Sequence, residues 1–313
     1  MIAYHAESFI AEAIEGVINQ KVDFPIELVI GDDCSKDNTR QICEAYAEKY
    51  PDIIRVLPPE VNLGITGNTA RTMGQCRGKY IAVCDGDDVW IDPRKLKKQV
   101  EFLEQHPDYG MSYSDVETVS ETGEPVEDPE HERLRPLYAK GAVFFKLIKG
   151  NFINNSTVVY RREFLADHVI SPDRSYQIQD HILWMHISTR SKIHFLNSKT
   201  TNYRKHARAL TSYVPASKIR GNKRMLHLYL FKAIEDFDRH NTTPLSGPEK
   251  VLLFRKMLSL LFRSPGSLRM RLRILRRMPK YFPGMVNFIK IGWSKVKSLL
   301  AIPFKTELVH VSK

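Results

Sequence analysis

The stretch KYIAVCDGDDVWIDP, residues 79–93, decides the fold, because three carboxylates follow directly on an apolar run. Asp85, Asp87 and Asp88 bring three like charges together, which is costly unless a cation lies among them. Carboxylate oxygens are the ligands that Mg²⁺ or Mn²⁺ prefers, and the same ions bind phosphate oxygens. Two interpretations follow: a divalent metal site, or a solvated acidic turn ahead of a helix that begins at Asp92-Pro93.

A second pair of acidic residues also follows an apolar run. The apolar run Ile26–Ile30 predicts a strand, and Asp32 and Asp33 follow it after one glycine. Further strands are predicted at Ile53–Leu57 and Tyr80–Cys84, and helices at Ser8–Asn19, within Asp33–Tyr50 and near Thr69–Cys76. Strands that alternate with helices predict an α/β fold with a mostly parallel, doubly wound sheet. In such a sheet ligands bind beyond the carboxyl ends of the strands, where both acidic clusters fall.

The positive charge of the chain is concentrated at its end. The 313 residues contain 47 Lys and Arg against 36 Asp and Glu, a net charge of +11. Residues 215–313 hold 21 basic and 5 acidic residues, so residues 1–214 hold 26 (47 less 21) and 31 (36 less 5). Between Lys250 and Thr306 fourteen residues are basic and none is acidic. We therefore expect a mildly acidic front part and a basic, helical C-terminal extension.

The composition excludes several classes of protein. Apolar residues make up 42% and charged residues 27% of the chain, as in ordinary globular domains. No run approaches the roughly 18 apolar residues of a membrane-spanning helix, and the first residues lack the pattern of a secretory signal. The four cysteines have no C-x-x-C or zinc-like spacing, which favours reduced thiols. We expect a cytoplasmic protein.

Five motifs follow one another over residues 4–115: YHAESFIAEAIEGVINQ, IELVIGDDCSKDNT, NLGITGN, GKYIAVCDGDDVW and IDPRKLKKQVEFLEQHPDYG. This series resembles the nucleotide-sugar-binding half of family 2 glycosyltransferases, which have the GT-A fold. Weaker matches at NNSTVVYRREFL, QDHILW and YRKHARALTS extend it to about residue 212. The resemblance implies a nucleotide-sugar-binding half at 1–115 and an acceptor-binding half at 116–214. Residues 215–313, which the resemblance does not cover, would form the helical basic tail.

The resemblance also implies a donor site for a nucleotide sugar, with a UDP-sugar expected. The residues assigned to it are Tyr4, Asp32, Asp33, Asn68, Asp85, Asp87, Arg204 and His206. Tyr4 would stack on the base, and Asp33 would accept a hydrogen bond from it. Asp87 and Asp88, in the D-x-D region, would hold Mg²⁺ or Mn²⁺. Arg204 and His206, from the motif YRKH, would lie near the diphosphate.

On the acceptor side the resemblance assigns Asp180, in QDHILW, as the catalytic base. Attack by a sugar hydroxyl on an anomeric carbon needs a carboxylate to take the proton, and a metal and basic groups stabilise the departing diphosphate. By itself Asp180 would be interpreted as a surface carboxylate on a helix. Asn155, Ser156 and Trp184 are assigned to the acceptor side, although Trp184 could equally pack in the core.

The chain departs from the family at its start. Relatives begin with a strand of the form V-S-V-I-I-P-x-Y-N in the middle of the sheet, and this chain begins at Met1-Ile2-Ala3-Tyr4. Since unpaired backbone groups in a sheet are expensive, we expect the true start to lie upstream. Thr69 and Ala70 stand where many relatives carry Arg-Asn in the helix after NLG, so Asn68 and Arg71 are expected to take that role.

The basic tail mixes large apolar residues with Arg and Lys. A basic amphipathic helix suits an anionic membrane surface, which predicts peripheral contact through residues 250–306 with the inner face of the plasma membrane. The alternative is a set of helices that pack together and expose a solvated basic face. Nucleic acid is not expected as a partner, because no reading motif is present.

These observations predict an inverting, metal-dependent glycosyltransferase of the cell envelope that acts on a glycan or lipid-linked acceptor. One alternative is a sugar-1-phosphate nucleotidyltransferase, which should show a Gly-rich N-terminal loop with Arg and Lys; none is present. Another is a non-catalytic module that binds a nucleotide sugar or tethers a complex to the membrane.

Overall fold

The computed structural model describes residues 1–58, 61–165, 179–207, 209, 230–263 and 268–281. The chain forms two compact units, Met1–Thr242 and Thr243–Lys313. The predicted start of the tail at residue 215 lies outside the described residues. The predicted division after residue 115 falls inside strand β6 (Tyr109–Val119), so the residues on both sides of it belong to one sheet.

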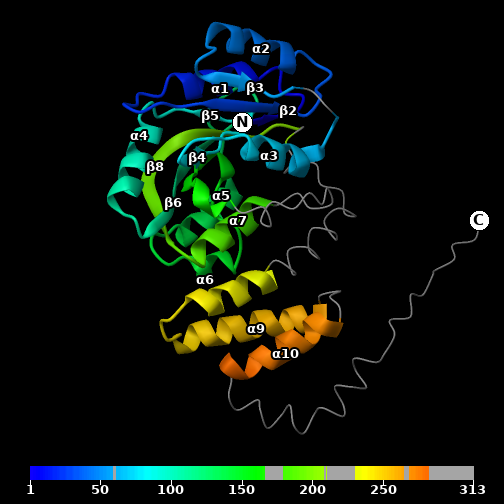
Figure 1. Cartoon of the computed structure of the whole chain (residues 1–313), viewed down its shortest axis with the longest axis vertical. Helices are drawn as coiled ribbons and strands as arrows, with labels where there is room; N and C mark the ends of the chain where they lie inside the picture. Colours follow the sequence, from blue (N-terminus) through cyan, green and yellow to red (C-terminus); the bar gives the residue numbers. More distant parts are fainter. Residues whose placement is uncertain (59–60, 166–178, 208, 210–229, 264–267, 282–313) are drawn as a thin grey trace, which may run out of the picture. The chain divides into compact units, whose positions relative to one another are not determined.

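Three parallel strands form the first sheet, in the order β1 (Ile2–Ala3), β2 (Leu28–Asp32) and β3 (Ile54–Val56). Helices α1 (Ile10–Ile18) and α2 (Thr39–Lys49) accompany it (Figure 1). The apolar stripe of α1, residues Ile10, Ile14 and Val17, enters the same core as Ile30 of β2. The predicted helix and strands of this region are confirmed, with shifts of a few residues at their ends.

Strand β1 lies between the two acidic clusters. Ile2 pairs with Gly31 of β2 and also forms a bridge with Asp85. This is the central place that the family resemblance implies for the first strand. Helix α3 (Gly64–Gly74) packs on β1 and β2. Its close approach requires a glycine at position 31, because a Cβ there would collide with the hydroxyl of Thr72.

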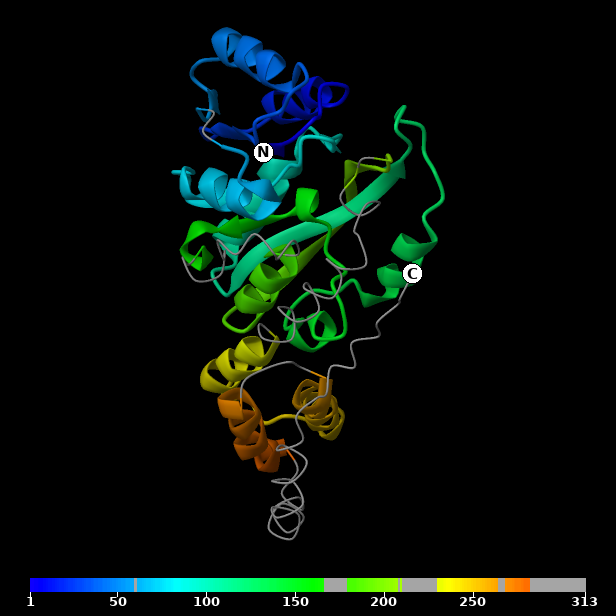
Figure 2. The same ribbon diagram turned by 90° about the vertical axis from the view of Figure 1, so that its right-hand side faces the viewer.

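Five strands form the second sheet, in the order β4-β7-β6-β8-β5. They are β4 (Tyr80–Ala82), β5 (Val89–Trp90), β6, β7 (Val159–Arg161) and β8 (Lys192–Arg204). Only β6 and β8, which run side by side through the unit (Figure 2), are parallel; the other three pairings are antiparallel. The fold is α/β as predicted. The first sheet is parallel, whereas the second sheet is mixed instead of mostly parallel. Buried parallel and antiparallel strands give the same apolar runs, so the sequence pattern could not separate them.

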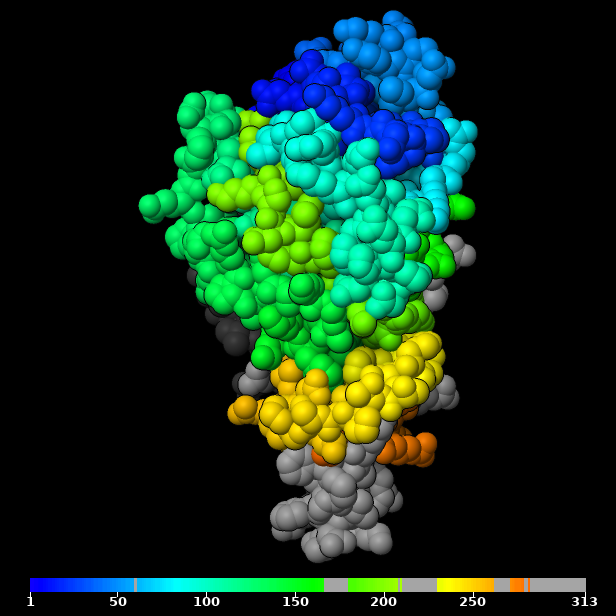
Figure 3. Space-filling view, turned by 90° about the vertical axis from the view of Figure 1, so that its left-hand side faces the viewer, coloured from blue at the N-terminus to red at the C-terminus, as the bar shows by residue number. Residues whose placement is uncertain are grey.

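The remaining elements of the first unit connect these strands. They are α4 (Lys95–Gln105), α5 (Pro129–Leu134), η1 (Arg135–Leu137), α6 (Phe144–Leu147), η2 (Asn155–Thr157), η3 (Arg162–Phe164), α7 (Gln179–Ser188) and a helix at residues 230–240. On one face of the unit the blue N-terminal residues border the cyan residues that lead through β5 (Figure 3), and α1 contacts β5 there.

In the second unit, helices α9 (Gly247–Arg263) and α10 (Leu268–Tyr281) pack against each other. Leu253, Met257 and Leu260 of α9 are buried, as are Ile274 and Met278 of α10. The predicted helical character of the tail is confirmed for these residues. Among the helices that the structure describes, none combines the length and the apolar composition needed to cross a bilayer.

Candidate functional site

The acidic loop, Asp85–Asp88, joins β4 to β5 and is held from one side by η2. The Nδ2 atom of Asn155 donates to both carboxylate oxygens of Asp85, at 3.1 Å each. The backbone N–H of Asp85 donates to Oγ of Ser156 at 3.0 Å, and the indole of Trp90 donates to the carbonyl of Ser156 at 2.8 Å. Asn155 and the fully buried Ser156, both predicted on the acceptor side, therefore fix the position of the acidic loop.

The end of β8 holds the acidic loop from the other side. The backbone N–H of Arg204 donates to Oδ1 of Asp88 at 3.0 Å, and Nε2 of His206 lies 3.1 Å from Oδ2 of Asp87. The Nδ1 atom of His206 is buried and has no hydrogen-bond partner among the residues that the structure describes. The structure thus brings the YRKH motif to the D-x-D region, with one imidazole nitrogen unpaired.

The acidic loop carries more negative charge than its surroundings neutralise. Burial, and then the charge of Asp87, raises the pKa of Asp85 to about 6. Burial, and then the charges of Asp87 and Asp85, raises the pKa of Asp88 well above its ordinary value. Within the described part of the chain no lysine or arginine side chain forms an ion pair with Asp85 or Asp88. A bound cation would relieve this repulsion.

Asp180 reaches the same region from the first turn of α7. Its Oδ2 accepts a hydrogen bond from Nδ2 of Asn151 at 2.8 Å, and burial raises the pKa of its carboxyl. The charge of Asp180 also contributes to the raised pKa of Asp85. A carboxyl with a raised pKa is better suited to accept a proton. No signal in the sequence marks Asn151 as its partner.

The end of β2 holds a second loop. Oδ1 of Asp33 accepts a hydrogen bond from the backbone N–H of Leu63 at 2.7 Å, and its carbonyl accepts one from Nδ2 of Asn62 at 2.9 Å. The carboxylate of Asp32 accepts from the backbone N–H of Ser35 at 3.2 Å. Asp32 and Asp33 therefore shape the loops at the carboxyl end of β2, where the predicted base contact lies.

Tyr4, predicted to stack on the base, follows β1 directly. Its side chain is 54% exposed, and its ring meets that of His5 edge to face at 4.3 Å. His5 itself has a positive φ of 53°, a conformation that turns the chain sharply away from the strand. An exposed aromatic ring at a strand end is available for stacking.

Two other predicted binding residues lie inside the fold. Asn68 is buried in α3, where its Nδ2 donates to the carbonyl of Gly31 at 2.6 Å and its Oδ1 accepts from Arg71 at 2.9 Å. Trp184 is fully buried in α7, and its ring meets that of Tyr160 edge to face at 5.9 Å. Both side chains have packing partners, and their contact with a donor or acceptor stays a prediction.

Arg204 lies behind the acidic loop. Its Nε donates to the carbonyl of Asp87 at 3.2 Å, its Nη1 donates to the carbonyl of Glu121 at 2.8 Å, and its Nη2 lies 2.6 Å from Oε2 of Glu12. The protein itself thus engages all three guanidinium nitrogens, and the expected place of Arg204 near a diphosphate stays a prediction. Nothing in the sequence pattern marks Glu12, because α1 also carries the exposed Glu15.

The carboxylates suit a divalent metal that is shared with a ligand. Among the residues that the structure describes, no group of three or more His, Cys, Asp or Glu side chains is arranged to hold a metal by itself. Mg²⁺ is commonly bound by one or two carboxylates and completes its coordination with water and phosphate oxygens. Asp87, which lies beside the imidazole of His206, and the buried Asp88 fit such an ion together with a diphosphate, not a cage built by the protein alone.

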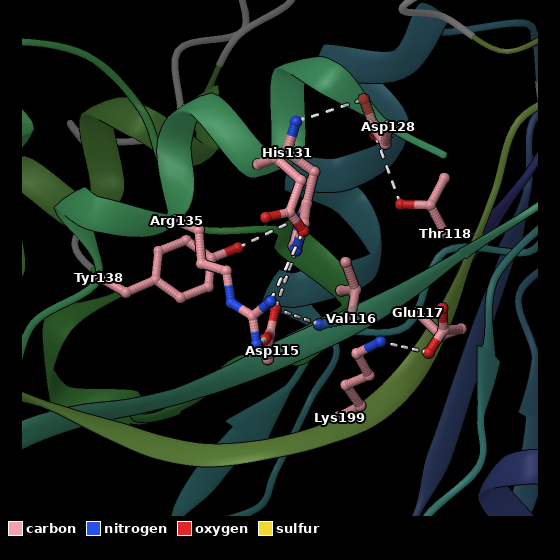
Figure 4. Close-up of polar contacts among 10 residues, drawn as sticks. Asp115, Val116, Glu117, Thr118, Asp128, His131, Arg135, Tyr138 and Lys199 are labelled. Atoms are coloured by element: carbon pink, nitrogen blue, oxygen red, sulfur yellow. Dashed lines mark hydrogen bonds and ion pairs between the residues drawn. The ribbon is translucent and has the colours of Figure 1, made fainter. Parts of the chain in front are cut away.

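A second polar cluster surrounds the buried Asp115 of β6 (Figure 4). Its Oδ1 lies 3.1 Å from Nε2 of His131, and its Oδ2 lies 3.4 Å from Nη2 of Arg135. Asp128 accepts hydrogen bonds from two backbone N–H groups in the first turn of α5 and pairs with Lys205 at 2.7 Å. These contacts tie α5 and η1 to both β6 and the end of β8.

Residues 1–169 match the model of the family described as Glycosyl transferase family 2. The chain belongs to this family. The match covers both strand ends that carry carboxylates, Asp32-Asp33 and the acidic loop, and also η2. Asp180 and the end of β8 lie beyond it.

One relative of this chain is the uncharacterized protein Rv1520 of Mycobacterium tuberculosis, which is 34% identical over 209 residues. The alignment covers 67% of this chain and 58% of the relative, so the chain spans less than two thirds of that protein's length.

Two solved structures are similar in fold. The Staphylococcus aureus protein TarS, residues 1–349 in complex with UDP, is 18% identical with a TM-score of 0.51, over 97% of this chain and 74% of TarS. The mannosyltransferase PcManGT of Pyrobaculum calidifontis, in complex with GDP-Man and Mn²⁺, is 15% identical with a TM-score of 0.53, over 96% of this chain and 81% of PcManGT. At these identities the likeness establishes the GT-A fold.

Proposed function

We propose that this protein is an inverting glycosyltransferase that moves a sugar from a nucleotide-diphosphate donor to a hydroxyl group of a glycan or lipid-linked acceptor. The observation that carries the proposal is the convergence of two distant segments, η2 and the end of β8, on the acidic loop. Membership in glycosyl transferase family 2 supports it. A cell-envelope polysaccharide is the proposed product.

The proposal includes Mg²⁺ or Mn²⁺, held by Asp87 and Asp88. Its support is the unneutralised charge of the acidic loop and the presence of Mn²⁺ in the structure of PcManGT, which has the same fold. When bound, the metal supplies positive charge to the diphosphate as it departs. His206, next to Asp87, would add to this stabilisation.

In the proposed reaction, the acceptor oxygen forms a bond to the anomeric carbon while the bond from that carbon to the diphosphate breaks. Asp180 takes the proton of the acceptor hydroxyl, a role suited to a carboxyl group whose pKa is raised by burial. Asn151 holds one of its oxygens, which orients the other. A single displacement of this kind inverts the anomeric configuration.

A UDP-sugar is the proposed donor. Tyr4 is exposed where the base would stack, and Asp33 lies at the neighbouring strand end. TarS, which shares the fold, was solved with UDP, whereas PcManGT was solved with GDP-Man. The identity of the nucleotide that this chain binds must therefore be tested by comparing UDP-, GDP- and dTDP-sugars directly.

The test is release of the nucleoside diphosphate by the full-length protein. A panel of UDP-, GDP- and dTDP-sugars is incubated with Mn²⁺, and metal-dependent release of one diphosphate is expected. Binding without release from any sugar would instead identify a non-catalytic nucleotide-sugar-binding module. Formation of a nucleotide sugar from a nucleoside triphosphate and a sugar 1-phosphate would identify a nucleotidyltransferase.

Contact with an anionic membrane is proposed for residues 250–306, which would place the protein on the inner, cytoplasmic face of the plasma membrane. Helix α10 contains six Arg and Lys and no acidic residue, and its Ile274 and Met278 are buried. Such a helix gains roughly 1 kcal/mol per basic residue near an anionic surface. Flotation with vesicles that contain anionic lipid is expected for the full-length protein, weaker at high salt, and lost without residues 250–313. Equal flotation of both chains would exclude this surface.

A further inference from the structure

Arg204 is the residue through which helix α1 reaches the acidic loop. Its side chain is only 5% exposed. Two of its three guanidinium contacts are neutral backbone carbonyls, those of Asp87 and Glu121. The third is the carboxylate of Glu12, at 2.6 Å. Since a buried cation is stable only with a charged or well-bonded partner, Glu12 supplies the one anion in this arrangement.

The same arginine holds two members of the acidic loop. Its Nε donates to the carbonyl of Asp87, and its backbone N–H donates to the carboxylate of Asp88. Its guanidinium also lies 5.0 Å from the ring of Phe9, which in turn lies 4.8 Å from the ring of His206. A displacement of Arg204, side chain and backbone together, would therefore reach the backbone of Asp87 and the carboxylate of Asp88, and through Phe9 also the imidazole.

Unlike Arg204, Glu12 is not buried. Its side chain is 61% exposed, and it lines an open groove of about 400 Å³ between α1 and β5. An exposed ion pair ordinarily contributes little to stability. Here one partner is buried and is bonded to the loop that carries the carboxylates, so orientation is the main effect expected of the pair.

We propose that Glu12 is a positioning residue for the acidic loop, which through Arg204 holds Asp87 and Asp88 in the geometry that binds a metal–diphosphate complex. This inference rests on the proposed function. Residues that orient metal ligands through hydrogen bonds typically change metal affinity about 10- to 100-fold when they are replaced. Glu12 does not touch the metal or the nucleotide.

The matched control is Glu15, an exposed carboxylate on the same helix that lines the same groove and accepts a hydrogen bond from Tyr46 at 2.6 Å. Glu12→Gln and Glu15→Gln remove the same charge one turn apart. The full-length variants are compared by calorimetric titration with UDP in the presence and in the absence of Mn²⁺, and by thermal unfolding.

For Glu12→Gln we expect about tenfold weaker binding of UDP with Mn²⁺ and unchanged binding of UDP without metal. The Tm should fall only slightly, because the amide oxygen of Gln can still accept a hydrogen bond from Nη2 of Arg204. Glu15→Gln should match the wild type in all three. In an Arg204→Lys background, Glu12→Gln should weaken the binding of UDP with Mn²⁺ by a further factor of less than ten, because both substitutions act on one contact.

Wild-type affinity in Glu12→Gln overturns the inference, and so does an equal loss with and without metal that accompanies a lower Tm. A wild-type protein that binds no nucleoside diphosphate with Mn²⁺ overturns the proposed function together with the inference. Wild-type binding with an unaffected Glu12→Gln overturns the inference alone.

Discussion

Nε2 of His206 lies 3.1 Å from Oδ2 of Asp87, although 119 residues separate them in the chain. The contact joins the last strand of the second sheet to the loop that follows β4. It also keeps the second imidazole nitrogen, Nδ1, buried and unpaired within the described residues. This pair marks the position where the proposed metal and diphosphate would bind.

Replacing Asp87 tests that position directly. Asp87→Asn keeps the size of the side chain and removes its charge, so we expect the affinity for UDP with Mn²⁺ to fall at least about tenfold. Chelation of the metal should weaken binding by the wild type, and should have little further effect on the variant. Calorimetry with and without EDTA provides the measurement, and equal metal dependence of the two proteins would contradict the assignment.

Asp180→Asn separates binding from chemistry. We expect release of the nucleoside diphosphate to fall by about 10² to 10⁴, the usual contribution of a general base, while UDP binding persists. A coupled assay of UDP release and a parallel binding titration measure the two effects. Retained release in the variant would assign the proton transfer to another group.

The stability of the metal-free protein should depend on Asp85 and pH. Its folded pKa is about 6 against an ordinary 3.8, raised first by burial and then by Asp87. The folded state therefore binds this proton more tightly than the unfolded state, so the contribution of Asp85 to stability falls as pH rises from about 4 to about 6. At pH 7 Asp85→Asn should be more stable than the wild type by about 1–3 kcal/mol.

Urea unfolding at pH 4 and pH 7, without metal or nucleotide, measures the effect of Asp85→Asn. The difference in the free energy of unfolding between Asp85→Asn and the wild type should be smaller at pH 4 than at pH 7. Asp23→Asn is the control of opposite sign, since a hydrogen bond from Lys97 lowers the pKa of Asp23. Asp23→Asn removes this favourable charge, so the variant should be slightly less stable than the wild type at pH 7. A destabilised Asp85→Asn at pH 7 would show that charge repulsion is not dominant in the loop.

Asp115→Asn tests the cluster of Figure 4. The substitution leaves His131 and Arg135 without their buried anion. Breaking a buried ion pair costs up to 3–5 kcal/mol, and because Arg135 is about half exposed we expect about 2 kcal/mol. Urea unfolding measures the loss. Arg133→Ala, which removes an exposed pair with Glu130, should change stability by less than about 0.5 kcal/mol.

The sequence by itself determined the local elements and the chemical type of the site. The apolar run before Asp85 predicts a strand, and the stripe Ile10, Ile14 and Val17 predicts a helix, because both patterns depend only on the period of the backbone. The family motifs added the roles that we propose for Tyr4 and Asp180.

Only the tertiary structure decided which strands pair antiparallel and which side chains support the carboxylates. Asn155 reaches Asp85 across 70 residues, and Glu12 reaches Arg204 across 192. Contacts of this kind depend on how separate segments pack, and neither periodicity nor local motifs encode that packing. For the same reason the motif that contains Arg204 could not reveal that its guanidinium contacts Glu12 and two backbone carbonyls of the protein.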